Sequence, residues 1–385
     1  VEMPESFDTS GMVDIAEQWW TVFRDQQLND LVDTALSGNF NLEVAWYNLM
    51  EARAVLDRES ATFLPFVDAF FQGEVNRPSR QFQFEQMMRL GLSASYEIDL
   101  WGRIGSQVKA ASFRAEAAEM DYRAAALSIS AEVALVWFRL KEARGQLDLA
   151  EEQVRTNEKI LNLLQNRFGT GQIRAVDILR QQALLESIRE EKILTETRMH
   201  ALEHQLAVLL GKSPRQLSFQ FQDTLPALPP LPETGLPAEL VNRRPDVQSA
   251  YKQLQAADRD LATAISNQYP RISLSASFST AAEKPGNLFQ DWFFTLAGDI
   301  LAPVFYGGQL GAEADRNEAI RQQQLYAYAQ AVLNAFREVE DALLREQKQK
   351  ERMRSLQMQH SFARKAYAQL RVEYFNGMSD YLDVL

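Results

Sequence analysis

Hydrophobic and polar residues alternate in four segments of the chain, and these segments come in two pairs. In the clearest one, 88–100, every second residue is apolar and the residues between are small, polar or charged. A period of two predicts a β-strand with one apolar and one polar face. The segment before it, 65–78, alternates less regularly, because Phe66 and Phe70 occupy polar positions. Together the two segments predict a β-hairpin.

The second pair of alternating segments lies at 272–279 and 292–302. The sequence therefore predicts two hairpins, within 63–101 and 268–306. Such two-faced strands fit either an antiparallel sheet that covers a core or a membrane β-barrel with lipid outside and water inside. The length of the hairpins and the scarcity of apolar residues on the neighbouring helices favour the barrel. On that interpretation the lipid-facing side chains are Leu90, Leu92, Tyr96, Ile98, Ile272, Leu274, Phe278, Phe294 and Leu296.

Four strands are too few to close a barrel, since small barrels need about 8. Open sheet edges are not tolerated in hydrocarbon, because their backbone groups have no water to bind. The membrane interpretation therefore predicts that the sheet closes with other copies of the same chain.

Each hairpin is followed by a segment with the composition of one very long helix. The first runs from 103 to about 166 and the second from about 309 to 374, and neither contains proline. At ~1.5 Å per residue the first helix would be roughly 95 Å long. Its apolar residues form a narrow stripe, which is typical of helices packed side by side in a coiled coil. The spacing of apolar residues also predicts helix over 27–59.

The first long helix is predicted to end at the glycines of Phe168-Gly169-Thr170-Gly171, and a helix over 175–210 to return beside it. The residues around this turn occur again at the end of the chain. Gly171 corresponds to Gly377 and Asp177 to Asp383, at one constant offset. A repeat of this length predicts two copies of one large unit.

The repeat gives a domain organisation of seven parts. They are the N-terminal segment and helices (1–62), the first hairpin (63–101), the first helical hairpin (102–210), a proline-rich linker (211–237), a helix of the second copy (238–267), the second hairpin (268–306) and the second long helix (307–385). The second copy stops just after its turn, so we expect that helix to be truncated at the tip.

Composition argues against several kinds of partner and site. The net charge of −12 argues against nucleic acid, which requires a basic surface. The chain has no cysteine, so disulfides and thiolate metal sites are excluded. His200 and His204 have a spacing that can hold zinc, but position 201 carries alanine where a zinc-protease motif has glutamate. We expect no metal and no cofactor.

Five motifs, in this order, resemble the outer-membrane efflux channel family, the TolC-like outer membrane factors, and within it the multidrug-efflux lipoprotein subgroup. They are Tyr96-Glu-Ile-Asp-Leu-Trp-Gly-Arg103, Asn242-Arg-Arg-Pro-Asp-Val247, Tyr269-Pro-Arg-Ile-Ser-Leu274, Pro303-Val-Phe-Tyr-Gly-Gly308 and Phe336-Arg-Glu-Val-Glu-Asp-Ala-Leu343. The resemblance covers essentially the whole chain.

The resemblance implies a homotrimer. Four strands from each chain would form a 12-strand barrel in the outer membrane of a Gram-negative bacterium, continued through the periplasm by a barrel of α-helices. It implies a passive exit duct for drugs or other small molecules in a tripartite pump, joined through a periplasmic adaptor protein to an inner-membrane transporter. It implies no catalytic activity.

The resemblance also implies roles for residues at the helix turns. Asp177, Asp383 and Tyr374 would form the gate of the duct, and Phe168, Gly169, Gly171, Phe375 and Gly377 would meet the adaptor. Rings of identical carboxylates would attract cations at the aperture. The structural alternative for each aspartate is an acidic residue in the first turn of a helix, stabilised by the helix dipole.

Two other functions remain open. A periplasmic coiled-coil scaffold or adaptor without a pore would explain the long helices, but not the two-faced hairpins. A duct of the same fold that serves type I protein secretion would explain both, and nothing in the residues separates drug from protein cargo.

Overall fold

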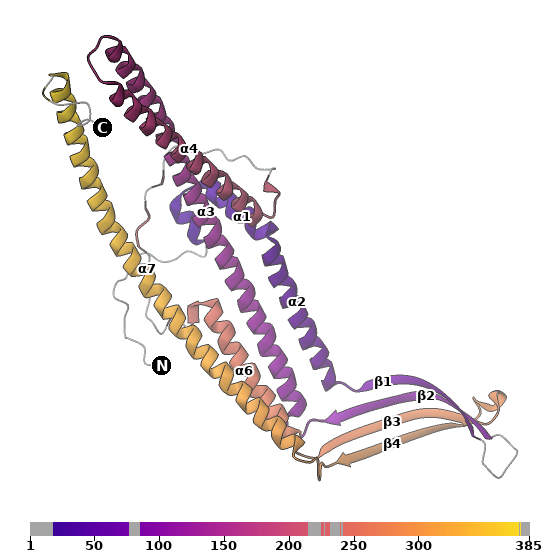
Figure 1. Cartoon of the computed structure of the whole chain (residues 1–385). Coiled ribbons are helices and arrows are strands. Elements are labelled where there is room, and N and C mark those ends of the chain that lie inside the picture. The colour runs from indigo at the N-terminus through magenta and orange to yellow at the C-terminus, as the bar shows by residue number, and fades with distance from the viewer. Residues whose placement is uncertain are drawn as a thin grey trace. The chain divides into compact units, whose positions relative to one another are not determined.

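The structure is a computed structural model that describes residues 18–76, 85–214, 225–226, 228–231, 239, 242–376 and 378. Its elements follow the predicted order (Figure 1). They are η1 (Trp19–Phe23), α1 (Gln26–Gly38), α2 (Phe40–Ser60), η2 (Ala61–Phe63), β1 (Phe66–Asn76), β2 (Glu85–Ile98), α3 (Arg103–Gly169), α4 (Ala175–Leu209), α6 (Pro245–Ser266), β3 (Arg271–Ala282), η4 (Pro285–Asn287), β4 (Trp292–Leu301) and α7 (Gln309–Phe375). The expectation of a mostly helical chain that carries four strands is confirmed.

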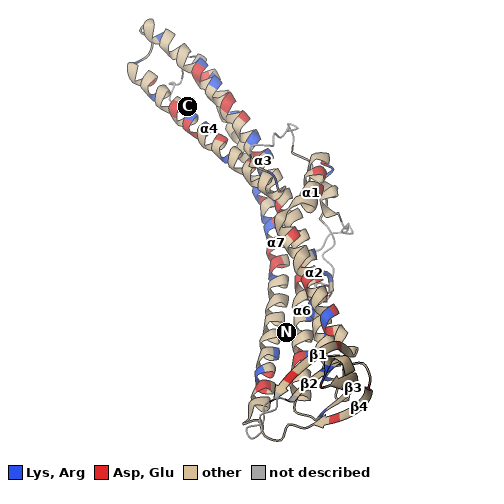
Figure 2. Cartoon of the chain, turned by 90° about the vertical axis from the view of Figure 1, so that its right-hand side faces the viewer, with Lys and Arg blue, Asp and Glu red and all other residues tan. Residues whose placement is uncertain are grey.

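The chain divides into two compact units. The first contains the described residues of 45–123 and 241–333, and the second those of 2–44, 124–240 and 334–385. The helices α3 and α7, of 67 residues each, contribute to both units. Acidic and basic residues are interspersed along α3, α4 and α7 (Figure 2).

The four strands form one antiparallel sheet in the order β1-β2-β3-β4. The central pair joins the two copies of the repeat, with Ile98 opposite Ile272 and Leu92 opposite Phe278. Residues opposite each other in an antiparallel pair project from the same face. The register therefore places all nine side chains predicted to face lipid on one face of the sheet.

The other face of the central strands is lined by small hydroxyl side chains. Ser93 lies opposite Ser277, and Ser95 lies opposite Ser275. On the same face the end of β2 carries Glu97, which lies opposite Ser273. The sheet thus has the two unlike faces that the alternation predicts.

Gly91 allows β2 and β3 to approach closely, and a side chain there should separate them. A Cβ atom at Gly91 would lie 2.5 Å from the Cβ of Ser279 and 2.6 Å from the carbonyl oxygen of Phe278. We expect Gly91→Ala to destabilise this strand pair by roughly 1–3 kcal/mol, as overpacking does elsewhere. Backbone amides of β2 and β3 should then exchange with deuterium faster than in the wild type.

Gly298→Ala is the matched control for this prediction, because a Cβ there meets only Leu274 Cδ2, at an ordinary 3.5 Å. Its exchange should equal that of the wild type. If both alanine variants exchange alike, the close approach at Gly91 does not govern the pairing.

The helical pattern over 27–59 is divided in the structure, where α1 ends at Gly38 and α2 begins at Phe40. The buried residue Asn39 caps the C-terminal end of α1 and the N-terminal end of α2. Its backbone N–H donates to the carbonyl oxygen of Ala35 at 2.9 Å, and its Oδ1 accepts from the N–H of Asn41 at 2.9 Å. Its Nδ2 donates to the carbonyl oxygen of Leu209 at 2.8 Å, which ties the break to the end of α4.

The second unit has a continuous hydrophobic core between η1, α1, α3 and α4. Its fully buried members include Leu28, Val32, Trp137, Leu140 and Leu206. Asp25 begins α1 at the edge of this core and accepts hydrogen bonds from the N–H groups of Gln27 and Leu28. The core therefore holds the N-terminal helix against the helical hairpin.

Candidate functional site

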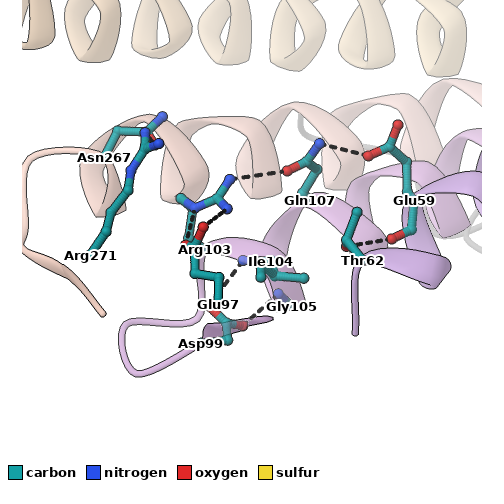
Figure 3. Close-up of polar contacts among 10 residues, drawn as sticks. All are labelled: Glu59, Thr62, Glu97, Asp99, Arg103, Ile104, Gly105, Gln107, Asn267 and Arg271. Atoms are coloured by element: carbon teal, nitrogen blue, oxygen red, sulfur yellow. Dashed lines mark hydrogen bonds and ion pairs between the residues drawn. The ribbon is translucent and has the colours of Figure 1, made fainter. Parts of the chain in front are cut away.

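Two regions carry the sequence motifs, the junction between sheet and helices in the first unit and the helix turn in the second. At the junction a chain of polar side chains connects β2, α3 and α2 (Figure 3). Arg103 donates from Nε and Nη2 to the two carboxylate oxygens of Glu97 at 2.9 and 2.7 Å. Arg103 Nη1 lies 3.4 Å from Gln107 Oε1, and Gln107 Nε2 donates to Glu59 at 2.6 Å.

The start of α3 is fixed by Asp99 and Gly102. Asp99 accepts hydrogen bonds from the backbone N–H groups of Ile104 at 3.0 Å and Gly105 at 2.7 Å (Figure 3). These bonds satisfy backbone donors that the start of a helix leaves unpaired. Gly102 has φ +71, a left-handed conformation that glycine adopts without strain. The motif Tyr96–Arg103 therefore forms the connection between the end of β2 and the start of α3.

At the same junction between sheet and helices, Trp101 connects the two copies of the repeat. Its indole Nε1 donates to the carbonyl oxygen of Pro270 at 2.7 Å, and its ring stacks on Tyr269 with centroids 5.1 Å apart. Ser266 Oγ donates to the carbonyl oxygen of Trp101 at 3.2 Å. The sequence identified these residues only as a signature, because contacts between copies leave no local pattern.

A polar pocket of about 690 Å³ lies beside this junction and is lined by α2, α3, α6, α7 and the first residue of β3. Its charged lining residues are Arg58, Glu59, Arg103, Arg114, Asp260, Arg271, Glu313 and Arg316. Arg114 forms an ion pair with Asp260 inside it. Burial raises the pKa of Asp260, and the charge and hydrogen bond of Arg114 oppose that rise without cancelling it.

The helix turn in the second unit depends on Gly171. The N–H of Gly171 donates to the carbonyl oxygen of Phe168 at 2.9 Å, and that of Gln172 to the carbonyl oxygen of Arg167 at 3.0 Å. Gly171 has φ +76, which explains why glycine ends the helix here. Phe168 is 46% exposed beside it.

Asp177 lies in the first turn of α4 and is buried. Its Oδ2 accepts a hydrogen bond from the backbone N–H of Arg174 at 3.3 Å, and the Arg174 guanidinium Nε lies 3.6 Å away. These contacts are those of a helix-capping residue. They describe the structural role of Asp177, and its place in a gate stays a prediction.

Tyr374 contacts the turn of the first helical hairpin. Arg167 Nη1 donates a hydrogen bond to its hydroxyl oxygen, and the centre of that guanidinium lies 5.0 Å from the centroid of the tyrosine ring. The sequence did not predict Arg167, although it lies next to the turn motif. Phe375 is the last residue of α7, and the predicted residues Gly377 and Asp383 lie outside the described residues.

One of the two histidines contacts a carboxylate. His200 Nδ1 lies 2.8 Å from Glu203 Oε2. Within the part of the chain that the structure describes, no three His, Cys, Asp or Glu side chains are grouped as a metal site.

None of the helices among the described residues has the length and hydropathy of a membrane span.

A sheet with one apolar face, together with long charged helices, is the architecture expected of an outer-membrane channel that extends into the periplasm. The model of the family described as "Outer membrane efflux protein" matches residues 31–212 and 236–385. The chain belongs to this family. It is an efflux duct of the outer membrane of a Gram-negative bacterium, as its sequence predicts.

Relatives and solved structures agree with this assignment. The chain is 30% identical over 337 residues to the pyoverdine export outer membrane protein OpmQ of Pseudomonas aeruginosa, covering 85% of this chain and 71% of OpmQ. It is 28% identical to the cation efflux system protein CusC of Escherichia coli, covering 100% and 85%. The structure of the outer-membrane channel OprN matches with a TM-score of 0.91 at 27% identity, covering 100% and 91%.

Proposed function

We propose that three copies of the chain close a barrel of twelve strands and act together as a passive exit duct. The observation that carries this proposal is the two-faced sheet with β1 and β4 at its edges. Four strands are too few for a barrel, and edge strands in lipid need partners. A ring of identical chains supplies them, because β4 of each copy can pair with β1 of the next.

We further propose that the chain joins a tripartite pump at its helical end. The helices α3 and α7 support a helical barrel that continues the duct and reaches a periplasmic adaptor, which connects it to an inner-membrane transporter. Phe168, Gly169, Gly171, Phe375 and Gly377 are the proposed docking residues. The exposed ring of Phe168 and the left-handed Gly171 suit a surface turn that a partner can cover.

The proposed cargo is drugs or other small molecules. The names of two relatives specify pyoverdine and toluene, and that of a third specifies cations. None of these is a protein, so small-molecule efflux is favoured over type I protein secretion.

We propose that the seven-part domain organisation holds for the whole chain.

We also propose that Asp177, Asp383 and Tyr374 belong to the gate. The contact of Arg167 with Tyr374 supports the proposed gate, because it joins the turn of one copy of the repeat to the end of the other. A contact between the two turns is suited to hold an aperture closed.

Asp383→Ala should raise the conductance of the purified protein in planar bilayers and weaken its selectivity for cations. The physical reason is that three carboxylates near one axis repel each other and attract cations. The measurement is single-channel conductance together with the reversal potential in a salt gradient. Wild-type protein that gives no channels in the bilayer would contradict the proposed duct itself.

Asp148→Ala is the matched control, because Asp148 forms an exposed ion pair with Arg144 in the middle of α3. Its conductance and selectivity should equal those of the wild type. Equal values for Asp383→Ala would remove this aspartate from the gate while leaving the duct intact.

A further inference from the structure

Apart from Met87 near the start of β2, the large apolar residues on the polar face of the described sheet lie on its two edge strands. The register places Phe66 and Phe70 of β1 opposite Ser95 and Gly91, and thus on the serine-lined face. The same reasoning places Leu301 of β4 on this face, since it lies opposite Arg271. Phe293, opposite Ser279, is also on this face but near the other end of β4. The three side chains nearer the helices, Phe66, Phe70 and Leu301, are called the clasp residues below.

The central strands differ from the edge strands on this face. From 87 to 97 and from 271 to 281, the residues of β2 and β3 on it are Met87, Arg89, Gly91, Ser93, Ser95, Glu97, Arg271, Ser273, Ser275, Ser277, Ser279 and Ala281. Among these, Met87 is the one large apolar residue, and it lies near the start of β2, at the end of that strand away from the helices. Toward the helices, where the central strands carry serine, glutamate and arginine, the large apolar residues on this face therefore belong to the edge strands.

Two of the clasp residues are uncovered in the single chain, and Phe70 is partly buried. Phe66 is 55% exposed and Leu301 is 65% exposed, and both lie at the end of the sheet nearest the helices. Exposed rings on a water-facing surface are unfavourable, since burying an aromatic side chain removes roughly 150–250 Å² from water. A partner that covers them would gain that free energy.

The same two edges also need backbone partners. Because β1 and β4 are the outermost strands of the described sheet, each has a row of backbone groups directed away from it. An antiparallel seam between β4 of one chain and β1 of the next places the end of β4 beside the start of β1. It therefore brings Leu301 of one copy beside Phe66 and Phe70 of the other.

We propose that the clasp residues form an apolar cluster across each seam between copies, on the water-filled side of the barrel. The occupant of the surface is thus a second copy of this chain. The inference rests on the closure of the sheet proposed above and adds which side chains hold the seam. It also explains why Phe66 and Phe70 interrupt an otherwise alternating strand.

The first experiment compares Phe66→Ser/Phe70→Ser with Phe71→Ser, a neighbouring ring on the opposite face of β1. The measurement is the rate at which purified trimers dissociate in mild detergent, followed by native mass spectrometry. We expect dissociation at least tenfold faster for the double variant, since a factor of ten corresponds to about 1.4 kcal/mol. Phe71→Ser should dissociate at the wild-type rate.

Equal dissociation rates for the double variant and the wild type would show that the clasp residues do not stabilise the seam, without contradicting the trimer. That result would also be expected if these rings met passing cargo instead of a second copy. Wild-type protein that is monomeric in the same detergent would instead overturn the closure of the barrel, so the two failures are distinct.

A second experiment decides the matter even if the serine variants do not fold. The chain has no cysteine, so Phe66→Cys with Leu301→Cys introduces the only thiols. Within one chain these residues lie on opposite edges, separated by three strand spacings (roughly 14 Å) across the sheet and by four residues (roughly 13 Å) along it, too far for a disulfide. A short bismaleimide should therefore link different chains and yield covalent trimers.

The control pair is Phe66→Cys with Phe293→Cys. Residue 293 lies on the same face as residue 301, opposite Ser279, but near the other end of β4. At the rise of a β-strand, the two positions on β4 are roughly 26 Å apart. The control pair should give no covalent trimer. Absence of cross-links for the pair at 66 and 301, or equal cross-linking of both pairs, would overturn the proposed seam.

Discussion

Gly211→Ala is expected to destabilise the second unit by roughly 2–5 kcal/mol. Gly211 follows α4 in a left-handed conformation, with φ +67. An L-residue in that conformation costs roughly 1–2 kcal/mol. A Cβ atom there would also lie 2.0 Å from the carbonyl oxygen of Gly38. The backbone must therefore move, at a further cost of roughly 1–3 kcal/mol. The measurement is the chaotrope concentration at which helical circular dichroism is lost.

The control for this prediction is Gly145→Ala in the middle of α3, where a Cβ atom would meet nothing within 4 Å. Alanine there should stabilise the helix by roughly 0.5–1 kcal/mol, because it has the higher helix propensity. The two alanine variants should therefore shift the midpoint in opposite directions. If both variants shift the unfolding midpoint in the same direction, the close contact between Gly38 and Gly211 does not limit the packing.

Asp25→Asn should lower the free energy of unfolding by about 3–5 kcal/mol, as loss of one partner from a buried ion pair does. Lys141 Nζ donates to Asp25 Oδ2 at 2.8 Å and Trp137 Nε1 donates to the same oxygen at 2.9 Å. The side chains of Asp25 and Lys141 are only 8% and 6% exposed. The variant would leave the lysine ammonium group buried without its counter-ion.

Control variants separate this pair from the general effect of removing a carboxylate. Asp30 lies at an exposed position on α1. Asp30→Asn should therefore change the free energy of unfolding by less than about 0.5 kcal/mol. Adding Lys141→Met to Asp25→Asn should recover part of the loss, because no buried charge then remains. If Asp25→Asn changes the free energy of unfolding as little as Asp30→Asn does, the ion pair does not stabilise the protein.

The same pair predicts how stability depends on pH. Burial raises the pKa of Asp25, but hydrogen bonds from Lys141, Trp137 and the Leu28 N–H outweigh it and hold the pKa below its ordinary 3.8. A carboxyl group with a lowered folded-state pKa stabilises the protein above its unfolded pKa, and this stabilisation is lost as the pH falls through the folded pKa. We expect the wild type to lose this contribution as the pH falls below about 4, and Asp25→Asn to lack that loss.

The sequence predicted the elements well where the signal is local. Alternation located all four strands, and the composition of α3 and α7 indicated helices far longer than average. The break at Asn39 was missed because the spacing of Leu42 and Leu49 continues that of Leu28 and Leu31 across it. Gly38 and Asn39 were the available signals, since glycine and asparagine commonly end helices.

The contacts of the site depend on partners that are distant in the sequence. The stacking of Trp101 on Tyr269 and the contact of Arg167 with Tyr374 each join one copy of the repeat to the other. Periodicity describes one element at a time and contains no information on which elements meet. The repeat indicated that Asp177 and Asp383 are equivalent, and the first turn of a helix was the structural alternative for both, but neither pattern identified the contact of Asp177 with Arg174.

The pairing of β2 with β3 has a consequence for how the protein folds. These strands are neighbours in space, but the whole helical hairpin of α3 and α4 lies between them in sequence. Helices form early from local contacts, whereas a sheet assembled from distant segments must wait for slow loop closure. The amphiphilic strands are therefore synthesised and held unpaired while the helices mature, so they need protection from aggregation on the way to the membrane.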